Sequence, residues 1–219
     1  MRITKFAQSC VLIEEAGTKI LIDPGFLLVD EPTIKQWKKA NFVLVTHKHV
    51  DHFDESSAKK LISSKIKFYS TKEVAAAYPS IKFRTVNKGQ KFVLGKVTIE
   101  VVNAQHGYNP LLKGDKEIYQ AVGYIIDNGT KRIYHTGDTI CFSNDYKCNV
   151  ILLPFNNHGV CMGPFEAALF AKETNAQLVL PIHADNPKFP ADKTKFEEEL
   201  KKNNLNYKFL KIGESTELL

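Results

Sequence analysis

Thr46-His47-Lys48-His49-Val50-Asp51-His52 is the stretch of this sequence that decides the fold, because it gathers three histidines and an aspartate within six residues. It directly follows Phe42-Val43-Leu44-Val45, a short apolar run that is β-branched and aromatic and is therefore typical of a buried strand. The histidines thus lie on the loop that leaves the carboxyl end of a strand, where α/β folds place their functional sites.

The spacing inside this stretch predicts ligands for two adjacent metal ions. His47 and His49 are two residues apart, so in extended backbone their side chains leave on the same side. Asp51 and His52 follow as the chain turns, which lets them face a second point close to the first. The alternative is that these are solvated loop histidines, but the density of the pattern favours a metal site.

Length and composition bound the class of protein. A chain of 219 residues can bury a sizeable core, and we expect one domain over residues 1–219. Contents of 43% hydrophobic and 25% charged residues are ordinary for a soluble globular protein. No apolar run reaches membrane-spanning length and the first residues contain no signal-type apolar segment, so we expect a cytoplasmic protein without a membrane partner.

The cysteines limit the types of metal ligand available, and the charges limit the classes of binding partner. Cys10, Cys141, Cys148 and Cys161 form no C-x-x-C pair and no disulfide framework, so a metal site must rest on histidine and carboxylate ligands. The net charge of +6 comes from scattered lysines, which are typical of solvated helix faces rather than of one basic stripe. A nucleic-acid partner is therefore not favoured, whereas an anionic small-molecule substrate is. A homo-oligomer is left open.

The order of the predicted elements indicates two sheets with outer helices. Helices are expected at residues 33–39, 55–64, 71–78, 163–173 and 190–203, with Asp54 as an N-cap and Pro164 in a favoured first-turn position. Strands are expected at residues 2–6, 9–14, 18–22, 42–45, 65–69, 81–86, 91–94, 97–104, 120–127, 131–136, 149–155, 177–182 and 207–212. Strands interleaved with helices in each half favour two sheets covered by outer helices in a single domain.

Three further histidine or aspartate positions lie just past other predicted strands. His106 follows the strand at 97–104, Asp138 follows the strand at 131–136, and His183 follows the strand at 177–182. A lone histidine at a strand end is more often structural than a metal ligand. Four strand ends that all carry such residues instead indicate one shared site.

We therefore predict a dinuclear centre of zinc-like ions. Its ligands would be His47, His49 and His106 on one ion, Asp51, His52 and His183 on the other, and Asp138 as the bridge. A hydroxide between the ions would be the nucleophile, because metal binding lowers the pKa of water to about 7. Asp51 would point a carboxylate oxygen toward that hydroxide and shuttle its proton.

Asp23, His135 and His158 are candidates for supporting or catalytic roles. Asp23 either accepts the far N–H of a ligand histidine and fixes its tautomer, or simply forms a turn. His135 is expected to orient the loop that carries Asp138. His158 either donates a proton to the leaving group or is a solvated loop histidine.

Together these residues resemble the metallo-β-lactamase fold superfamily. The resemblance covers most of the chain, through Leu21-Ile22-Asp23-Pro24-Gly25, the stretch 47–52, His106, His135-Thr136-Gly137-Asp138-Thr139 and His183. Ser9-Cys10-Val11-Leu12-Ile13-Glu14 and Met162-Gly163-Pro164-Phe165-Glu166-Ala167-Ala168 also resemble compact metal-dependent hydrolases related to ascorbate-phosphate lactonase. The resemblance implies a four-layer αββα fold of the α/β class, in which helices flank two mixed sheets. It also implies a dinuclear site in the cleft between the sheets, usually with zinc and sometimes with manganese.

Two departures from the compact group bear on the pocket. Gln8 stands where many relatives carry a histidine, and Asn156-Asn157-His158-Gly159 is not the glycine-rich form expected of the group. Superfamily members cleave lactones, thioesters, β-lactams and phosphodiesters, so the resemblance does not specify a substrate.

The expected function is a metal-dependent hydrolase that acts on a small ester, lactone or phosphoester. Substrate contacts are expected from residues 140–147 and from the polar connection 107–116, in which Tyr108, Lys113 and Lys116 could meet an anionic group. A solvated loop is the alternative for that connection. Two rival functions are a nucleic-acid phosphodiesterase of the same fold, and a non-hydrolytic mononuclear-iron oxygenase or metal-binding protein. The absence of a long inserted arm disfavours the phosphodiesterase.

Overall fold

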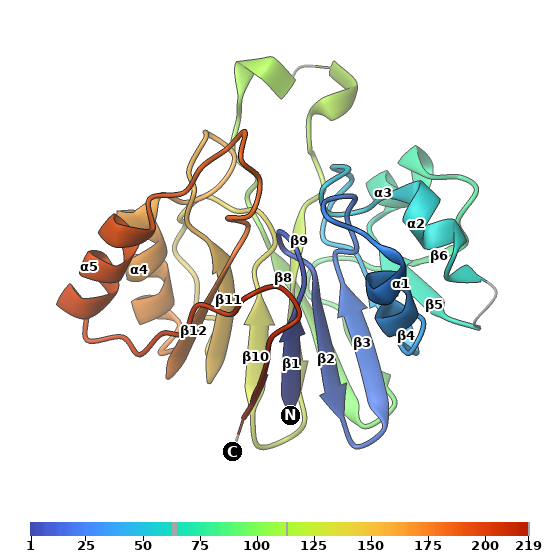
Figure 1. Ribbon diagram of the computed structural model, residues 1–219, viewed down its shortest axis with the longest axis horizontal. Helices are drawn as coiled ribbons and strands as arrows, with labels where there is room; N and C mark the ends of the chain where they lie inside the picture. The colour runs from blue at the N-terminus through green and yellow to red at the C-terminus, as the bar shows by residue number, and fades with distance from the viewer. Residues whose placement is uncertain (63–64, 113, 219) are drawn as a thin grey trace.

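Two β-sheets pack face to face at the centre of the structure, and helices cover the outer face of each sheet (Figure 1). The coordinates are a computed structural model, which describes residues 1–62, 65–112 and 114–218. The layers follow the order helix, sheet, sheet, helix, so the αββα architecture expected from the sequence is confirmed.

The first sheet has the strand order β13-β1-β2-β3-β4-β5-β6. Its strands are β1 (Arg2–Lys5), β2 (Val11–Glu15), β3 (Thr18–Ile22), β4 (Phe42–Leu44), β5 (Lys67–Ser70), β6 (Phe83–Thr85) and β13 (Ser215–Glu217). The strands from β13 to β3 pair antiparallel, and those from β3 to β6 pair parallel. Parallel neighbours need crossover connections, which here contain α1 (Glu31–Trp37), α2 (Glu55–Lys59) and α3 (Lys72–Ala77).

The second sheet has the order β12-β11-β10-β9-β8-β7 and is also mixed. Its strands are β7 (Lys91–Leu94), β8 (Val97–Asn103), β9 (Val122–Asp127), β10 (Arg132–His135), β11 (Val150–Pro154) and β12 (Leu178–Ile182). The strands from β7 to β10 pair antiparallel, whereas β10, β11 and β12 pair parallel. The outer helices of this half are α4 (Pro164–Glu173) and α5 (Lys193–Lys202).

Both faces of each sheet are buried. Ile13 of the first sheet and Ile99 of the second belong to the apolar cluster between the sheets. The outer face of the first sheet packs with Trp37 of α1, and that of the second sheet packs with Phe170 of α4 and Phe196 of α5. Burial on both sides explains why the central strands are nearly continuous apolar runs in the sequence.

Two expected elements differ clearly from the structure, whereas the ends of the others shift by at most three residues. Helix α2 ends at Lys59 rather than at residue 64, because the Lys60 N–H already bonds to the carbonyl three residues back; residues 63 and 64 lie outside the described part. The prediction of a strand at residues 207–212 is wrong. Tyr207 forms a single bridge to Val179 at the edge of the second sheet, and the chain then crosses to the first sheet, where β13 pairs with β1. A segment that passes between two sheets cannot keep strand pairing with either.

The carboxyl ends of four strands lead into one edge of the sandwich. β4 leads into the stretch 46–52, β8 into His106, β10 into Asp138 and β12 into His183. An arch of two short 3₁₀ helices, η2 (Pro110–Leu112) and η3 (Gly114–Lys116), rises above this edge and is the green segment at the top of Figure 1. Among the helices that the structure describes, none is both long and apolar enough to cross a membrane.

Candidate metal centre

Side chains from four loops converge at this edge of the sandwich. The ring centroids of His47 and His106 lie 5.0 Å apart, and those of His49 and His106 lie 4.8 Å apart. Next to them, the rings of His52 and His183 stack with their centroids 5.2 Å apart. Residues that are distant in the sequence therefore meet, as the strand-end positions lead one to expect.

Three groups of side chains present ligand atoms close enough to share an ion. Within each group the ligand atoms all lie within 4.8 Å of one another. The groups are His47, His49 and His106; Asp51, His52 and His183; and His47, His52 and Asp138. The first two are the sets expected for two separate ions. The third joins Asp138 to one histidine from each set, which is the arrangement that the predicted bridging role requires.

Two histidines of the first group bond outward to backbone carbonyls. His49 Nε2 lies 2.8 Å from the carbonyl oxygen of Lys116, and His106 Nδ1 lies 2.8 Å from that of Gly107. A carbonyl can only accept, so these two ring nitrogens carry the protons. The lone pairs of His49 Nδ1 and His106 Nε2 are therefore free to face the cluster.

Asp23 fixes two further rings from behind. Its Oδ2 accepts from His52 Nδ1 at 2.7 Å and from the Thr46 hydroxyl at 2.7 Å, and its Oδ1 accepts from the Thr46 N–H at 2.8 Å. Since Thr46 gives its hydroxyl proton to Asp23, its oxygen can accept from His47 Nδ1, which is 3.0 Å away. The expected contact of Asp23 with the far N–H of a clustered histidine is confirmed.

The atoms that face inward fit a cation. His52 Nε2, His106 Nε2 and Asp138 Oδ1 are buried and make no hydrogen bond in the described part of the chain, although His52 Nε2 and Asp138 Oδ1 face each other at 3.3 Å. His47 Nε2 lies 3.2 Å from His49 Nδ1, and the outward bonds leave no proton between these two nitrogens. A buried polar atom without a partner costs about 1–3 kcal/mol, and divalent ions that prefer nitrogen and carboxylate ligands would satisfy all of these atoms.

The electrostatics at His47, His106 and Asp51 favour the protonation states that metal ligands need. Burial lowers the pKa of His47, which neighbouring histidines lower further, and burial lowers the pKa of His106 to about 4. Burial opposes ionisation of Asp51, but the hydrogen bond from His183 and the nearby His52 outweigh it and lower the pKa of that carboxyl. At neutral pH these groups are therefore neutral imidazoles and a carboxylate, the forms that bind metal.

Two glycines allow the loops of the site to approach closely. A Cβ on Gly25 would lie 1.9 Å from the carbonyl oxygen of Asp51, and a Cβ on Gly137 would lie 2.8 Å from Thr46 Cβ. Gly137 also has a φ of +62°, which favours glycine. Larger side chains at these positions would push the loops of Asp51 and Asp138 away from the cluster.

His135 lies behind the cluster and contacts the loop of Asp138, as its expected role requires. Its Nε2 donates to the carbonyl of Ser9 at 2.8 Å, and its Nδ1 accepts from the Gly137 N–H at 3.3 Å. The ring thus ties the turn after β10 to the first sheet. It belongs to none of the ligand groups found among the described residues.

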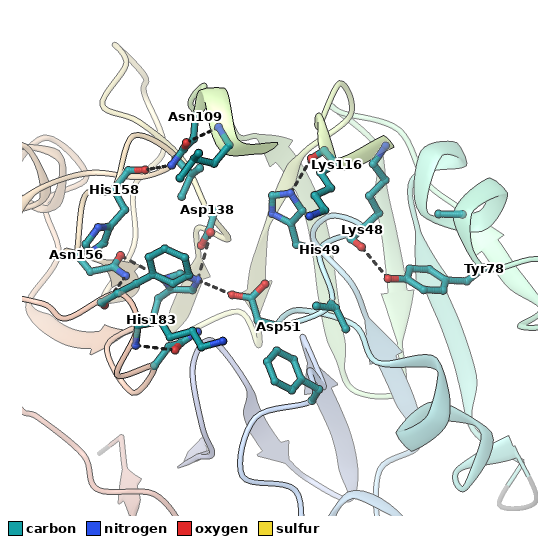
Figure 2. A pocket seen from close by; sticks show the side chains of 18 residues that line it. Lys48, His49, Asp51, Tyr78, Asn109, Lys116, Asp138, Asn156, His158 and His183 are labelled. Atoms are coloured by element: carbon teal, nitrogen blue, oxygen red, sulfur yellow. Dashed lines mark hydrogen bonds and ion pairs between the residues drawn. The ribbon is translucent and has the colours of Figure 1, made fainter. Parts of the chain in front are cut away.

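A cavity of about 690 Å³ opens above the cluster. His49, Asp51, Asp138 and His183 lie at its floor (Figure 2). His158 lies in its side wall, where Nε2 is 3.0 Å from the Pro190 carbonyl oxygen. The ring of His158 is therefore held by the wall, and its role in proton transfer stays a prediction.

The connections expected to contact substrate do so only in part. The side chain of Lys116 turns down toward the floor of the cavity (Figure 2), whereas Tyr108 lines a smaller neighbouring cavity. Lys113 lies outside the described residues. The expectation for residues 140–147 is wrong, because this segment lies outside the wall of the large cavity and Phe142 packs against Phe170 with ring centroids 5.4 Å apart.

Sequence analysis missed two amide side chains that hold ligands in place. Gln8 Nε2 donates to Asp51 Oδ2 at 3.3 Å, and Gln8 Oε1 accepts from the backbone N–H groups of residues 185 and 186 at 3.0 Å each. Asn156 Oδ1 lies 3.2 Å from His183 Nδ1 and accepts its proton. The departures from the family pattern at Gln8 and in the 156–159 segment were the only sequence signals that pointed to these positions.

Comparison with known proteins identifies the family. The sequence model described as "Beta-lactamase superfamily domain" matches residues 2–183. The chain belongs to this superfamily. A UPF0173 metal-dependent hydrolase of Korarchaeum cryptofilum is 31% identical over 234 aligned positions that cover 100% of both chains. A UPF0173 protein of Pyrococcus furiosus is 29% identical over 212 positions, which cover 94% of this chain and 93% of the relative.

Solved structures agree with this assignment. Igni18, a metallo hydrolase of Ignicoccus hospitalis, has a TM-score of 0.81 at 25% identity and covers 100% of this chain and 99% of its own. The expected superfamily and fold are therefore confirmed, and this member of the beta-lactamase superfamily is a metal-dependent hydrolase with the metallo-β-lactamase fold. The relationship to ascorbate-phosphate lactonase stays a prediction.

Proposed function

We propose that this chain is a dinuclear hydrolase that acts on a small ester, lactone or phosphoester. The observation that supports the proposal is the division of the inward-facing ligand atoms into two groups, which a third group joins by placing Asp138 beside His47 of one and His52 of the other. The proposed ligands are His47, His49 and His106 for one ion, Asp51, His52 and His183 for the other, and Asp138 for both. Zinc is the first candidate and manganese the second, because imidazole and carboxylate ligands suit zinc best.

Other groups of the protein hold the histidines of this centre in fixed orientations. Ions bound there would lower the pKa of a water toward neutrality and polarise the substrate oxygen on which negative charge develops. Asp23, Asn156 and the carbonyl of Lys116 each hold the outer nitrogen of one histidine, so the inner lone pairs point to fixed places. Rings that are already oriented need no rearrangement when the substrate reacts.

Asp51 is the proposed proton acceptor. Its side chain is 22% exposed at the floor of the cavity, whereas Asp138 is only 2% exposed. Oδ2 of Asp51 accepts from Gln8 Nε2 at 3.3 Å. Oδ1 is therefore the atom that can receive a proton from an attacking water. His158 is the candidate donor to the leaving group, and it would first have to release the carbonyl of Pro190.

Lys116 is the proposed contact for negative charge on the substrate. It forms no ion pair within the described residues, and its side chain turns into the cavity (Figure 2). Lys48 lines the same cavity, but its Nζ is held 3.1 Å from Glu73 Oε1 and points away from Asp51. Lys116 near the floor suits a small substrate that carries, or develops during the reaction, a single negative charge.

The cavity does not favour the nucleic-acid alternative. Three lysines and no arginine occur among the described residues that line it. Proteins that hold a phosphodiester backbone usually present a longer row of lysine and arginine side chains. Metal content, rather than the shape of the cavity, distinguishes the proposed dinuclear hydrolase from a mononuclear-iron oxygenase.

Elemental analysis and a substrate panel test the proposal. Metal-stripped protein is reloaded with zinc or manganese and assayed on chromogenic esters, lactones, thioesters and phosphodiesters. We expect close to two ions per chain, together with turnover of an ester, lactone or phosphoester that stops on chelation. One iron per chain without hydrolysis would support the oxygenase, and activity that falls steeply with salt would support the nucleic-acid enzyme.

A further inference from the structure

Four large apolar side chains line the cavity above the metal centre and stay exposed to solvent. Phe26 is 45% exposed, Val50 is 52% exposed, Leu111 is 82% exposed and Phe189 is 41% exposed. They come from four different segments, including the arch, so they surround the cavity rather than follow one element. Scattered apolar residues on a surface are ordinary, but apolar residues gathered around one opening mark a binding site.

The acidic groups of the same cavity lie at its floor. Asp51 and Asp138 are the only acidic residues among its described lining, and both belong to the proposed metal centre. Lys116 is the lysine that points to that floor (Figure 2). The described lining contains no arginine, whose planar fork is the usual partner of a doubly charged phosphate. A floor with one such cation is suited to a carbonyl group on which a single negative charge develops.

We infer that the substrate is a carboxylic ester or lactone that carries an apolar hydrocarbon chain, an assignment that rests on the proposed hydrolase function. The reacting carbonyl would lie at the floor beside Asp51 and Lys116. The hydrocarbon chain of the substrate would extend toward the mouth of the cavity and cover Leu111 and Phe189. Burial of these exposed side chains against a hydrocarbon chain supplies binding free energy that a short or strongly polar substrate cannot supply.

A chain-length series tests this inference on the zinc-loaded protein. The substrates are 4-nitrophenyl acetate, butyrate and hexanoate, with 4-nitrophenyl phosphate as the charged comparison. We expect kcat/KM to rise by about two- to fourfold for each added methylene, mainly through KM. Leu111→Ser and Phe189→Ser should each lower the ratio of the hexanoate value to the acetate value. Both residues are exposed, so neither substitution removes a buried core contact.

Val93→Ser is the matched control. Val93 is 68% exposed on the edge strand β7 and does not line the cavity. The Val93→Ser variant should therefore have the same ratio of hexanoate kcat/KM to acetate kcat/KM as the unsubstituted protein. A hexanoate-to-acetate ratio near one in the unsubstituted protein, together with metal-dependent hydrolysis of the acetate, would overturn the inference. It would not contradict the proposed hydrolase function. Faster turnover of the phosphate than of the hexanoate would also overturn it. No turnover of any panel substrate by protein that holds two ions would instead contradict the proposed function.

Discussion

Asp23 Oδ2 and His52 Nδ1 lie 2.7 Å apart behind the proposed metal centre, and both side chains are fully buried. Burial alone would lower the pKa of His52, but the carboxylates of Asp138 and Asp23 outweigh it and hold that pKa well above its ordinary value. The ring thus stands between two carboxylates, with Nε2 3.3 Å from Asp138 Oδ1. A metal that binds Nε2 has to displace only the inner proton, because Asp23 keeps the proton on Nδ1.

Replacement of Asp23 by asparagine tests whether this contact controls metal binding. The carboxylate accepts from His52 and twice from Thr46, and an amide can present only one oxygen to those donors. We expect Asp23→Asn to weaken metal binding by about 10- to 100-fold, measured by competition with a chromophoric chelator. Asp54→Asn, at the N-cap of α2, is the control and should bind metal like the parent chain. Unchanged affinity in Asp23→Asn would reduce Asp23 to a turn former.

Two substitutions of Gln8 separate its structural role from its effect on catalysis. Gln8→Ala removes the acceptor of two backbone N–H groups, so we expect the free energy of unfolding of the metal-free protein to fall by about 1–3 kcal/mol. Gln8→Glu keeps that acceptor but turns a second carboxylate oxygen toward Asp51 Oδ2. We therefore expect a smaller loss of stability and a fall in kcat of about tenfold, which corresponds to about 1.4 kcal/mol. Equal losses of stability and kcat in both variants would show that Gln8 is purely structural.

The convergence of the proposed ligands can be predicted from the sequence because each follows an apolar strand. His106 comes after β8 and His183 after β12, and the carboxyl ends of such strands meet at one edge of an α/β sandwich. The supporting amides give no comparable signal, since amide side chains are common in loops. Gln8 binds the backbone of Asp185, which is 177 positions away. Lys116 holds His49 through a carbonyl group, which every residue has.

The error at the end of the chain has a different cause. Four of the residues 207–212 are apolar, which is typical of a strand, but such a composition does not say which sheet edge a segment can reach. Phe209 packs against Phe196 of α5, with ring centroids 6.5 Å apart, while the backbone crosses between the sheets. Apolar side chains here bury against a helix rather than against a neighbouring strand, so the pattern is satisfied without strand pairing.

Lys116 is tested by two substrates of similar size and different charge. 4-Nitrophenyl hemisuccinate carries a carboxylate, and 4-nitrophenyl butyrate is its neutral counterpart. If the Nζ of Lys116 meets a negative group of the substrate, Lys116→Met should lower kcat/KM for the hemisuccinate by about tenfold or more relative to the butyrate. Lys96→Met, at an exposed position between β7 and β8, should leave this ratio unchanged. Equal losses on both substrates would assign Lys116 to the reacting carbonyl instead.

Asp138 provides the most direct test of a shared centre. It forms one ligand group with His47 and His52, and each of these histidines also belongs to another group. We expect Asp138→Ala to retain less than one ion per chain after gel filtration, because both halves lose a ligand. Its kcat/KM should fall by more than the roughly 100-fold that loss of an outer hydrogen-bond partner costs. Asp145→Ala, which removes an exposed carboxylate, should keep both metal and activity. An Asp138→Ala protein that keeps two ions would mean that the halves bind metal independently, because a bridging ligand cannot be lost without weakening both.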